Sequence, residues 1–154
     1  MLVIGMTMCF GGCGDATSDS MADIYYDSER LGSYYSSYKM SDFSQEMDGN
    51  GISGNYENLN GMVLLWNYEP EEDIALDVKY YMKVLQGKVK LIMVDSDGGM
   101  VTIAELSNGV TADMMKTYSF SMHDGLYCLK LVGTDDAVVD FEIQVDEGAF
   151  VGAN

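Results

Sequence analysis

The chain has few basic residues, with 8 Lys and Arg against 25 Asp and Glu, and its formal net charge is −17 at pH 7. A field of this sign repels the phosphate backbone of nucleic acids. We therefore expect no nucleic-acid partner. Acidity of this kind is typical of a soluble surface and does not by itself indicate a cation site.

Histidine is also scarce, and this limits the chemistry that the chain can perform. His123 is the only histidine, so a metal site with several imidazoles is excluded and only a catalytic triad could use it. It stands beside Asp124 in a predicted turn, and no Gly-x-Ser-x-Gly elbow for a nucleophile is present. Carboxylates this dense form pairs by chance. We predict that the protein is not an enzyme and that it has no catalytic residue and no cofactor.

Long hydrophobic runs are missing as well. The apolar, uncharged segment Leu2–Phe10 would span only about 14 Å as a helix, roughly half of the hydrocarbon core of a bilayer. It is too short for a transmembrane helix, but its length suits the apolar region of a secretory signal. The alternative is that this segment is a first strand or a buried part of the domain.

The apolar segment leads into Phe10-Gly11-Gly12-Cys13, where small residues precede a cysteine. This pattern resembles a bacterial lipobox. The resemblance implies that residues 1–12 are a signal peptide and that Cys13 receives the lipid and becomes the first residue of the mature protein. It also implies attachment to the cell membrane through this lipid, on the extracytoplasmic face.

The three cysteines fit the same interpretation. Cys9 would be removed with the signal peptide and Cys13 would be acylated, which leaves Cys128 without a partner for a disulfide. We expect Cys128 to be a small packing residue rather than a nucleophile.

Residues 13–42 are rich in Ser, Asp and Tyr and have few aliphatic side chains. We predict a flexible tether that begins at the lipidated cysteine, with a root-mean-square reach of roughly 30 Å. The alternative is that its tyrosines form a short helix or a patch that packs on the domain. These tyrosines are Tyr25, Tyr26, Tyr34, Tyr35 and Tyr38.

After the tether, apolar residues alternate with polar ones, as half-buried strands require. The clearest case is 74–85, which we expect to pair with 62–68 as a hairpin through the acidic turn 69–73. A second hairpin joins 89–93 to 100–106 through Asp95-Ser96-Asp97-Gly98-Gly99.

Three further strands follow the same alternation. Two of them, 118–122 and 127–131, are joined by a turn at His123-Asp124-Gly125. A turn at 133–136 then leads to the last strand, in which Val139, Phe141, Ile143 and Val145 point inward and Asp140, Glu142 and Gln144 outward.

Seven strands are thus predicted, and residues 43–58 are either an eighth strand or a Gly-rich loop. The fold class that we predict for residues 43–154 is all-β, an antiparallel β-sandwich of jelly-roll type with seven to eight strands in two packed sheets. A closed barrel is the alternative.

Two segments carry a resemblance over roughly residues 60–146, namely Lys88–Val101 (KVKLIMVDSDGGMV) and Tyr118–Gly133 (YSFSMHDGLYCLKLVG). They resemble the small β-sandwich domains of Gram-positive surface lipoproteins, and they are similar to carbohydrate-binding and pre-peptidase C-terminal sandwiches. The resemblance implies a fold and a location, because one sandwich can host many functions.

Calcium is one candidate ligand, because several turns offer clustered oxygens. The segment Asp95–Gly98 begins like an EF-hand loop, but its glycine comes two positions early and Leu106 stands where the bidentate Glu belongs. Asp48–Gly51 and Glu69–Asp73 stay open as oxygen sources for a structural calcium ion, although each is more simply a turn.

A glycan or a surface protein is the other candidate ligand. Aromatic residues often bind sugar rings, but Trp66 lies in alternation with Met62 and Leu64, so we predict that it is part of the core. The 13 methionines would equally suit a protein-binding surface. We expect a membrane-anchored, non-catalytic binding or accessory domain, whose ligand is a glycan or a partner protein.

Overall fold

The computed structural model describes residues 21–110 and 114–154 of the chain. Within these ranges two short helices precede eight strands. The helices are η1 (Asp23–Tyr26) and α2 (Ser28–Leu31), and the strands are β1 (Ser37–Lys39), β2 (Asp42–Asp48), β3 (Gly51–Tyr68), β4 (Ile74–Val94), β5 (Met100–Ser107), β6 (Lys116–Met122), β7 (Tyr127–Val145) and β8 (Ala149–Phe150). None of these helices is long and apolar enough to cross a membrane. The predicted signal peptide and Cys13 lie outside the described residues.

Strands β3, β4 and β7 are long, and each takes part in both layers of the fold. In layer A, residues 51–56 of β3, 138–145 of β7 and 74–84 of β4 lie side by side, with β2 and β6 at the edges. In layer B, the other halves of these strands are flanked by β1 and β8 on one side and by β5 on the other.

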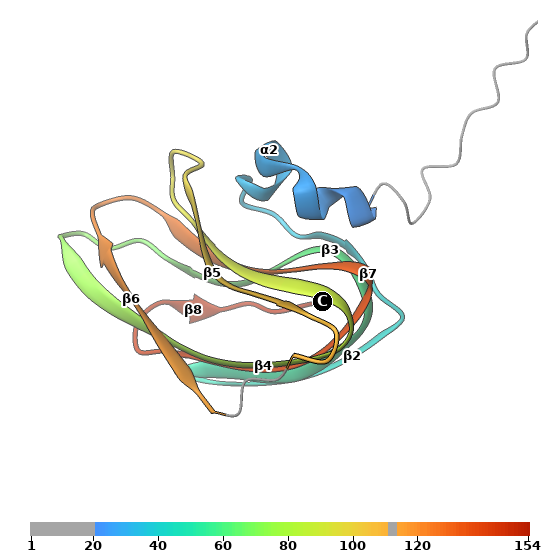
Figure 1. Cartoon of the computed structure of the whole chain (residues 1–154). Coiled ribbons are helices and arrows are strands. Elements are labelled where there is room, and N and C mark those ends of the chain that lie inside the picture. Colours follow the sequence, from blue (N-terminus) through green and yellow to red (C-terminus); the bar gives the residue numbers. More distant parts are fainter. Residues whose placement is uncertain (1–20, 111–113) are drawn as a thin grey trace, which may run out of the picture.

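The two layers belong to one continuous sheet that turns back on itself, as Figure 1 shows. All strand pairs are antiparallel. The predicted fold class, an antiparallel β-sandwich of jelly-roll type with seven to eight strands, is therefore confirmed. The expectation of two separate sheets was wrong, because hydrogen bonding continues from one layer into the other.

The sheet bends where its long strands carry irregular residues. Asn58, Gly87 and Asp135 have positive φ values of 54°, 72° and 58°, and the strand register shifts around Asn58 and on both sides of Gln86, the neighbour of Gly87. Such bulges bend a strand and increase its twist. Gly87 cannot be replaced without strain, because a Cβ atom there would lie 2.5 Å from the carbonyl oxygen of Thr134.

These bends correct two of the predicted chain reversals. The segment 133–136 was expected to be a turn between two strands, but β7 runs through it without interruption. In the same way, the strands expected at 74–85 and 89–93 are the two halves of β4. Gly and Asp favour positive φ in turns and in bulges alike, so the local sequence did not distinguish the two.

One predicted hairpin and one predicted turn between neighbouring strands were also wrong. Strands β3 and β4 do not pair, because β7 lies between them, and the acidic segment 69–73 crosses from layer B to layer A. Likewise β6 pairs with β4 and not with β7, so 123–126 crosses back. The hairpin of β4 and β5 is confirmed. Residues 43–58 form most of a further hairpin, made by β2 and β3 through the turn after Asp48.

The main core lies between the two layers. It holds the residues predicted to point inward from β4 and β7, which are Leu76, Val78, Tyr80, Met82, Val84, Val139, Phe141, Ile143 and Val145. Trp66 is buried there as predicted, and its Nε1 donates a hydrogen bond of 2.7 Å to the carbonyl of Glu147. The prediction that Trp66 lies on the same face of its strand as Met62 and Leu64 was wrong, however. A register shift between Leu64 and Trp66 turns Met62 and Leu64 toward the opposite side of layer B.

A second core lies on that opposite side, where residues 21–36, which we call the cap, cover the outer face of layer B. The buried cap residues are Ile24, Tyr25 and Leu31, and they pack against Met62, Ile92, Val94, Cys128 and Val132. Cys128 is thus a buried packing residue, as expected. The prediction of a flexible tether was wrong for residues 21–42, because its apolar side chains are buried here. Figure 1 shows both helices lying over this face.

Two lysines of layer B hold the cap by its backbone. Lys130 Nζ donates hydrogen bonds to the carbonyls of Leu31, at 2.9 Å, and Ser33. Lys90 Nζ donates to the carbonyl of Tyr25 at 2.6 Å and lies 4.3 Å from the centre of its ring. Burial lowers the pKa of both lysines. The cap corresponds to the alternative in which the tyrosines of residues 13–42 form a short helix or a patch on the domain, but its carbonyl contacts with the two lysines leave no sequence motif.

Candidate functional site

A hollow of about 800 Å³ lies on the outer face of layer A, where β2, β3 and β7 meet. Its wall is built from both ends of the β2–β3 hairpin turn and from the second half of β7. The lining residues are Glu46, Met47, Asp48, Gly49, Asn50, Gly51, Ile52, Ser53, Glu142, Ile143 and Gln144. The floor consists of paired backbone from three neighbouring strands, so it is held by the sheet and not by a loop.

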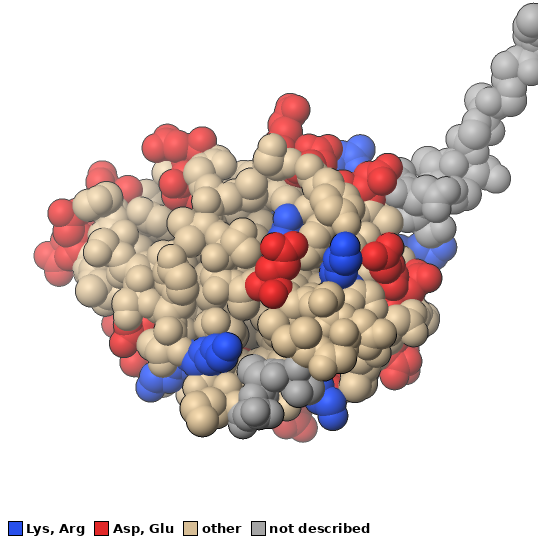
Figure 2. Space-filling model, viewed as in Figure 1, with Lys and Arg blue, Asp and Glu red and all other residues tan. Residues whose placement is uncertain are grey.

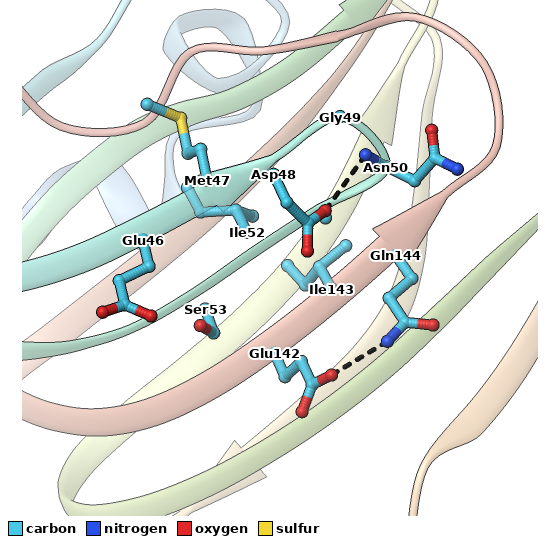
Figure 3. Close-up of a pocket in the computed structure, with 11 residues that line it drawn as sticks. Glu46, Met47, Asp48, Gly49, Asn50, Ile52, Ser53, Glu142, Ile143 and Gln144 are labelled. Atoms are coloured by element: carbon cyan, nitrogen blue, oxygen red, sulfur yellow. Dashed lines mark hydrogen bonds between the residues drawn. The ribbon is translucent and has the colours of Figure 1, made fainter.

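Strand alternation places polar side chains on this outer face. Glu46 lies opposite Ser53, and Ser53 lies opposite Glu142, so the three form one row across β2, β3 and β7. Their strand neighbours Ile52 and Ile143 point into the core. In Figure 3 the carboxylates of Glu46 and Glu142 lie on the same side of the ribbon as Ser53, whereas Met47 points the other way.

Some polar groups of the hollow already form hydrogen bonds within the protein, and others do not. Gln144 Nε2 donates a hydrogen bond of 2.9 Å to Glu142 Oε1, and Asp48 Oδ1 accepts one of 3.1 Å from the backbone of Asn50, which fixes the turn. Within the described part of the chain, the side chains of Glu46 and Ser53 form no hydrogen bond. They face solvent and are free to bind a ligand.

This arrangement offers hydrogen bonds of both kinds. The carboxylates of Glu46, Asp48 and Glu142 accept them, and the Ser53 hydroxyl and the side-chain amides of Asn50 and Gln144 donate or accept them. No lysine or arginine lines the hollow. A ligand with many hydroxyl groups matches such a wall, because each hydroxyl can donate to a carboxylate and accept from an amide.

The turns considered for calcium belong to three different connections: 48–51 joins β2 to β3, 69–73 joins β3 to β4, and 95–98 lies between β4 and β5. No group of three or more His, Cys, Asp or Glu side chains within the described ranges is placed to hold a metal ion. In the EF-hand-like segment, Asp95 Oδ1 accepts hydrogen bonds from the backbone of Asp97 at 2.9 Å and of Gly99 at 2.8 Å. Asp95 therefore closes its own turn. Asp48 does the same in the β2–β3 turn.

His123, the only histidine, lies at the surface in the segment that joins β6 to β7. Its Nδ1 is 3.0 Å from Oδ1 of Asp73, and both side chains are more than two-thirds exposed, at 71 % and 77 %. This pair links two crossings between the layers, far in the chain from the hollow. Among the described residues, no serine or cysteine side chain forms a hydrogen bond with this pair.

Most aromatic residues of the described ranges lie away from the hollow. Trp66 is buried, and the most exposed aromatic residues, Tyr26, Tyr35 and Phe43, lie on the cap and on β2. Only one aromatic residue, Tyr81, stands in register with the polar row of the hollow, where it faces Glu142 from β4.

The sequence contained part of this site. Glu142 and Gln144 were predicted to point outward, and the structure places both at the hollow. Glu46 and Ser53 were missed, because residues 43–58 had no clear assignment and their apolar residues are sparse. The only local signal is the alternation of polar residues Asp42, Ser44, Glu46 and Asp48.

Comparison with known proteins gives fold-level similarity only. No family model matches the chain, and no curated protein matches it in sequence. Among solved structures, a mutant family 29 carbohydrate-binding module complexed with mannohexaose is similar with a TM-score of 0.38 and 14 % identity, over 71 % of this chain and 80 % of that one. A second family 29 carbohydrate-binding module has a TM-score of 0.35 and 12 % identity, over 71 % and 77 %. Similarity at this level does not assign a function.

Proposed function

We propose that this domain is a non-catalytic binding module and that its ligand is a neutral glycan held in the hollow of layer A. The observation that carries the proposal is the hollow itself, about 800 Å³ in size and lined by carboxylate, amide and hydroxyl groups on a rigid three-strand floor. Rigid floors favour binding because little conformational entropy is lost when the ligand arrives.

The charge of the hollow narrows the ligand class. Glu46, Asp48 and Glu142 surround it without a basic residue, so a sulfated, phosphorylated or uronic-acid polymer would be repelled. The chain as a whole also repels anionic polymers, since its formal net charge is −17. Figure 2 shows acidic side chains spread around the outline of one face of the molecule, with fewer basic ones, mainly over its middle and lower edge.

The test is a titration of the whole reduced chain with neutral and anionic oligosaccharides, followed by thermal unfolding. A ligand at 100 times its dissociation constant adds about 2.7 kcal/mol to the free energy of unfolding, a shift of several degrees. We expect a shift with one class of neutral glycan and none with polygalacturonate. If no neutral glycan in the panel shifts the transition, the proposal is wrong.

Two variants connect any binding to the hollow. Glu142→Gln removes a charged acceptor from the hollow, and we expect it to weaken glycan binding about tenfold, because hydrogen bonds to charged groups contribute about 1.5–3 kcal/mol. Glu57→Gln is the matched control, because Glu57 is exposed on the same strand, β3, and does not line the hollow. The recovered glycan is also examined by chromatography. Shortened products would show hydrolysis and would contradict a non-catalytic module.

A protein partner is the alternative ligand, and strand β5 favours it. Among the described residues this strand pairs only with β4, on one side, and Met100 and Val101 on it are exposed. An open strand edge with apolar side chains can pair with a strand of another protein. Cross-linking of a cell-surface partner to β5, with no glycan bound, would favour this alternative.

We further propose that the mature protein is attached to the extracytoplasmic face of the cell membrane through a lipid on Cys13. The support is the Phe10-Gly11-Gly12-Cys13 sequence after a short apolar segment. Metabolic labelling with palmitate tests it directly. We expect label on the wild-type chain and none on Cys13→Ala, and label that persists in Cys13→Ala would contradict the proposal.

A further inference from the structure

The polar row of the hollow continues onto a fourth strand. Glu142 of β7 lies opposite Ser53 on one side and opposite Tyr81 of β4 on the other. The row therefore runs from Glu46 through Ser53 and Glu142 to Tyr81, across four adjacent strands. Because neighbouring strands lie about 4.8 Å apart, its length is about 14 Å.

Tyr81 is unusual in its position. Its neighbour in sequence, Tyr80, points into the core, whereas Tyr81 is on the outer face and partly exposed. The residues beside it on the outer face of β4 are charged, Lys79 and Lys83. Within the described part of the chain, Tyr81 takes part in no hydrogen bond and no ring pair. Neither core packing nor a polar network explains an aromatic ring at this place.

An aromatic ring on the surface beside a polar hollow can stack on a sugar ring if the ligand is an oligosaccharide. One face of a hexose carries C–H groups and stacks on an aromatic ring, while its hydroxyl groups bind carboxylates and amides at its edge. The row offers both contacts in line, since Tyr81 stands next to Glu142.

We propose that Tyr81 is the stacking residue of a second subsite and that the ligand is a linear neutral oligosaccharide lying across the strands, from the hollow to β4. This inference rests on the proposed function of the hollow. One sugar ring binds between Glu46, Ser53 and Glu142, and a later ring of the same chain lies on Tyr81. A row of about 14 Å is longer than one ring, so the site selects for chain length.

Chain length provides the sharpest test. The whole reduced chain is titrated with cellohexaose and cellobiose, mannohexaose and mannobiose, and xylohexaose and xylobiose. We expect one hexasaccharide to bind at least tenfold more tightly than its disaccharide. In Tyr81→Ala this advantage is lost, because the hexasaccharide weakens about tenfold, while the affinity for the disaccharide is unchanged. Tyr81→Phe retains the advantage, because stacking needs the ring and not its hydroxyl.

Controls separate this inference from a general loss of folding. Tyr26→Ala removes an exposed tyrosine from the cap, on the opposite layer, and should bind as wild type does. Tyr81→Thr, which suits an exposed strand position, repeats the test should Tyr81→Ala be unstable. The thermal transition, followed by Trp66 fluorescence, shows that each variant is folded.

The outcomes are distinguishable. If the wild-type chain binds no neutral saccharide, the proposed function fails and this inference fails with it. If it binds hexasaccharide and both Tyr81→Ala and Tyr81→Thr bind it equally well, only this inference is overturned, and the ligand is confined to the hollow. Equal loss of hexasaccharide and disaccharide in Tyr81→Ala also overturns it, because the ring would then support the hollow and not a second subsite.

Discussion

Replacement of Leu31 by alanine tests whether the cap is part of the folded domain. Leu31 is 2 % exposed and packs in the second core between the cap and layer B. Removal of a buried leucine costs about 2–5 kcal/mol, from lost burial and from the cavity left behind. We take about 3 kcal/mol for Leu31, because it lies at the end of a short helix that can relax partly. For a domain of this size, such a loss lowers the Tm by about 10 °C.

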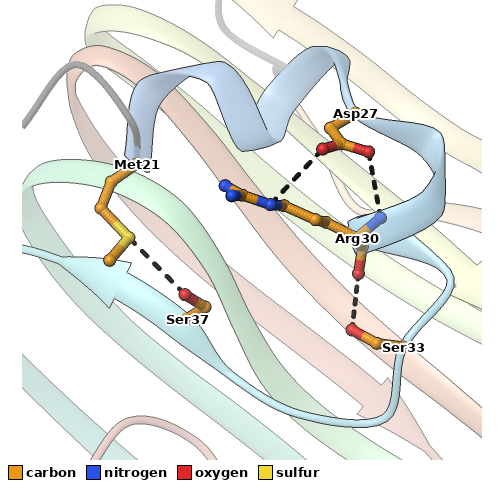
Figure 4. A network of polar contacts seen from close by, with 5 residues as sticks. All are labelled: Met21, Asp27, Arg30, Ser33 and Ser37. Carbon is orange, nitrogen blue, oxygen red and sulfur yellow. Dashed lines mark hydrogen bonds and ion pairs between the residues drawn. The ribbon is translucent and has the colours of Figure 1, made fainter. Parts of the chain in front are cut away.

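The exposed ion pair of the cap contributes little beside this loss. Figure 4 shows the Asp27 side chain accepting a hydrogen bond from the backbone of Arg30 and pairing with its guanidinium at 3.4 Å. Ser33 and Ser37 make the other contacts drawn there, with the Arg30 carbonyl and Met21. Both charged side chains of the ion pair are more than 40 % exposed, so this pair contributes little, about 0–1 kcal/mol.

Chemical denaturation followed by Trp66 fluorescence measures the effect, since Trp66 is the only tryptophan and is buried in the other core. Tyr35→Ala is the matched control, because Tyr35 is a cap residue that is 53 % exposed. We expect a change below about 0.5 kcal/mol for the control. If Leu31→Ala is also that small, residues 21–36 are a tether in solution and our description of the cap is wrong.

Three further predictions concern the bend and the second core. Gly87→Ala should destabilise the domain by about 2–4 kcal/mol, because a Cβ atom there combines a positive φ with a 2.5 Å contact. Gly98→Ala is the control and should cost about 1 kcal/mol, because Gly98 also has a positive φ but lies in open space. Equal losses of stability in urea denaturation would contradict a bend that depends on Gly87. Burial raises the pKa of the Cys128 thiol from its ordinary 9.0 to about 11. The neutral buried thiol therefore contributes to the free energy of unfolding below pH 9, and this contribution is lost as the pH rises through 11. The free energy of unfolding of the wild type relative to Cys128→Ala should therefore fall by about 2 kcal/mol over this range, and a pH-independent difference in denaturation experiments would refute the assignment. Iodoacetamide should modify Cys128 in urea but not in the native protein, because the thiol is buried, and mass spectrometry of the peptide measures this. Rapid labelling of the native protein would mean that the cap opens readily.

The strands were predictable from the sequence because alternation is a local property. In residues 76–84 of β4 and in the second half of β7, every second residue is apolar, and the structure places each of these residues in the main core. The pairing of strands was less predictable, because it depends on contacts far apart in the chain. The sequence suggested that β3 pairs with β4, its neighbour in order, but β7 enters between them. No residue of β3 or β4 indicates in the sequence that β7 lies between these two strands.

The bends were not predicted and the cap was foreseen only as an alternative to a tether, for two different reasons. At 133–136, Gly and Asp have the same preference in a bulge as in a turn, so a continuous strand looked like two. In the cap, only a few apolar residues are buried, spread over a segment that is otherwise polar. The partners of Lys90 and Lys130 are backbone carbonyls, which every residue possesses. A buried lysine of this kind is visible only once the chain is folded.

The candidate site shows the same division between local and tertiary information. Outward positions for Glu142 and Gln144 follow from alternation, and the turn after Asp48 follows from its Gly-Asn-Gly sequence. That these groups meet depends on the register of β2, β3 and β7, which places Ser53 between Glu46 and Glu142. Register is set by the complete set of buried contacts in both layers. A binding surface formed across strands therefore appears only in the structure.

The hollow and the cap lie on opposite outer faces of the sandwich but on the same strands. Residues 51–53 of β3 line the hollow, and Met62 of the same strand contacts the cap. Only seven residues, 14–20, separate Cys13 from the first described residue of the cap, and seven extended residues reach at most about 25 Å. If Cys13 carries the proposed lipid, the cap begins within this distance of the anchor, whereas the hollow lies on the opposite face of the sandwich, accessible to a glycan outside the cell.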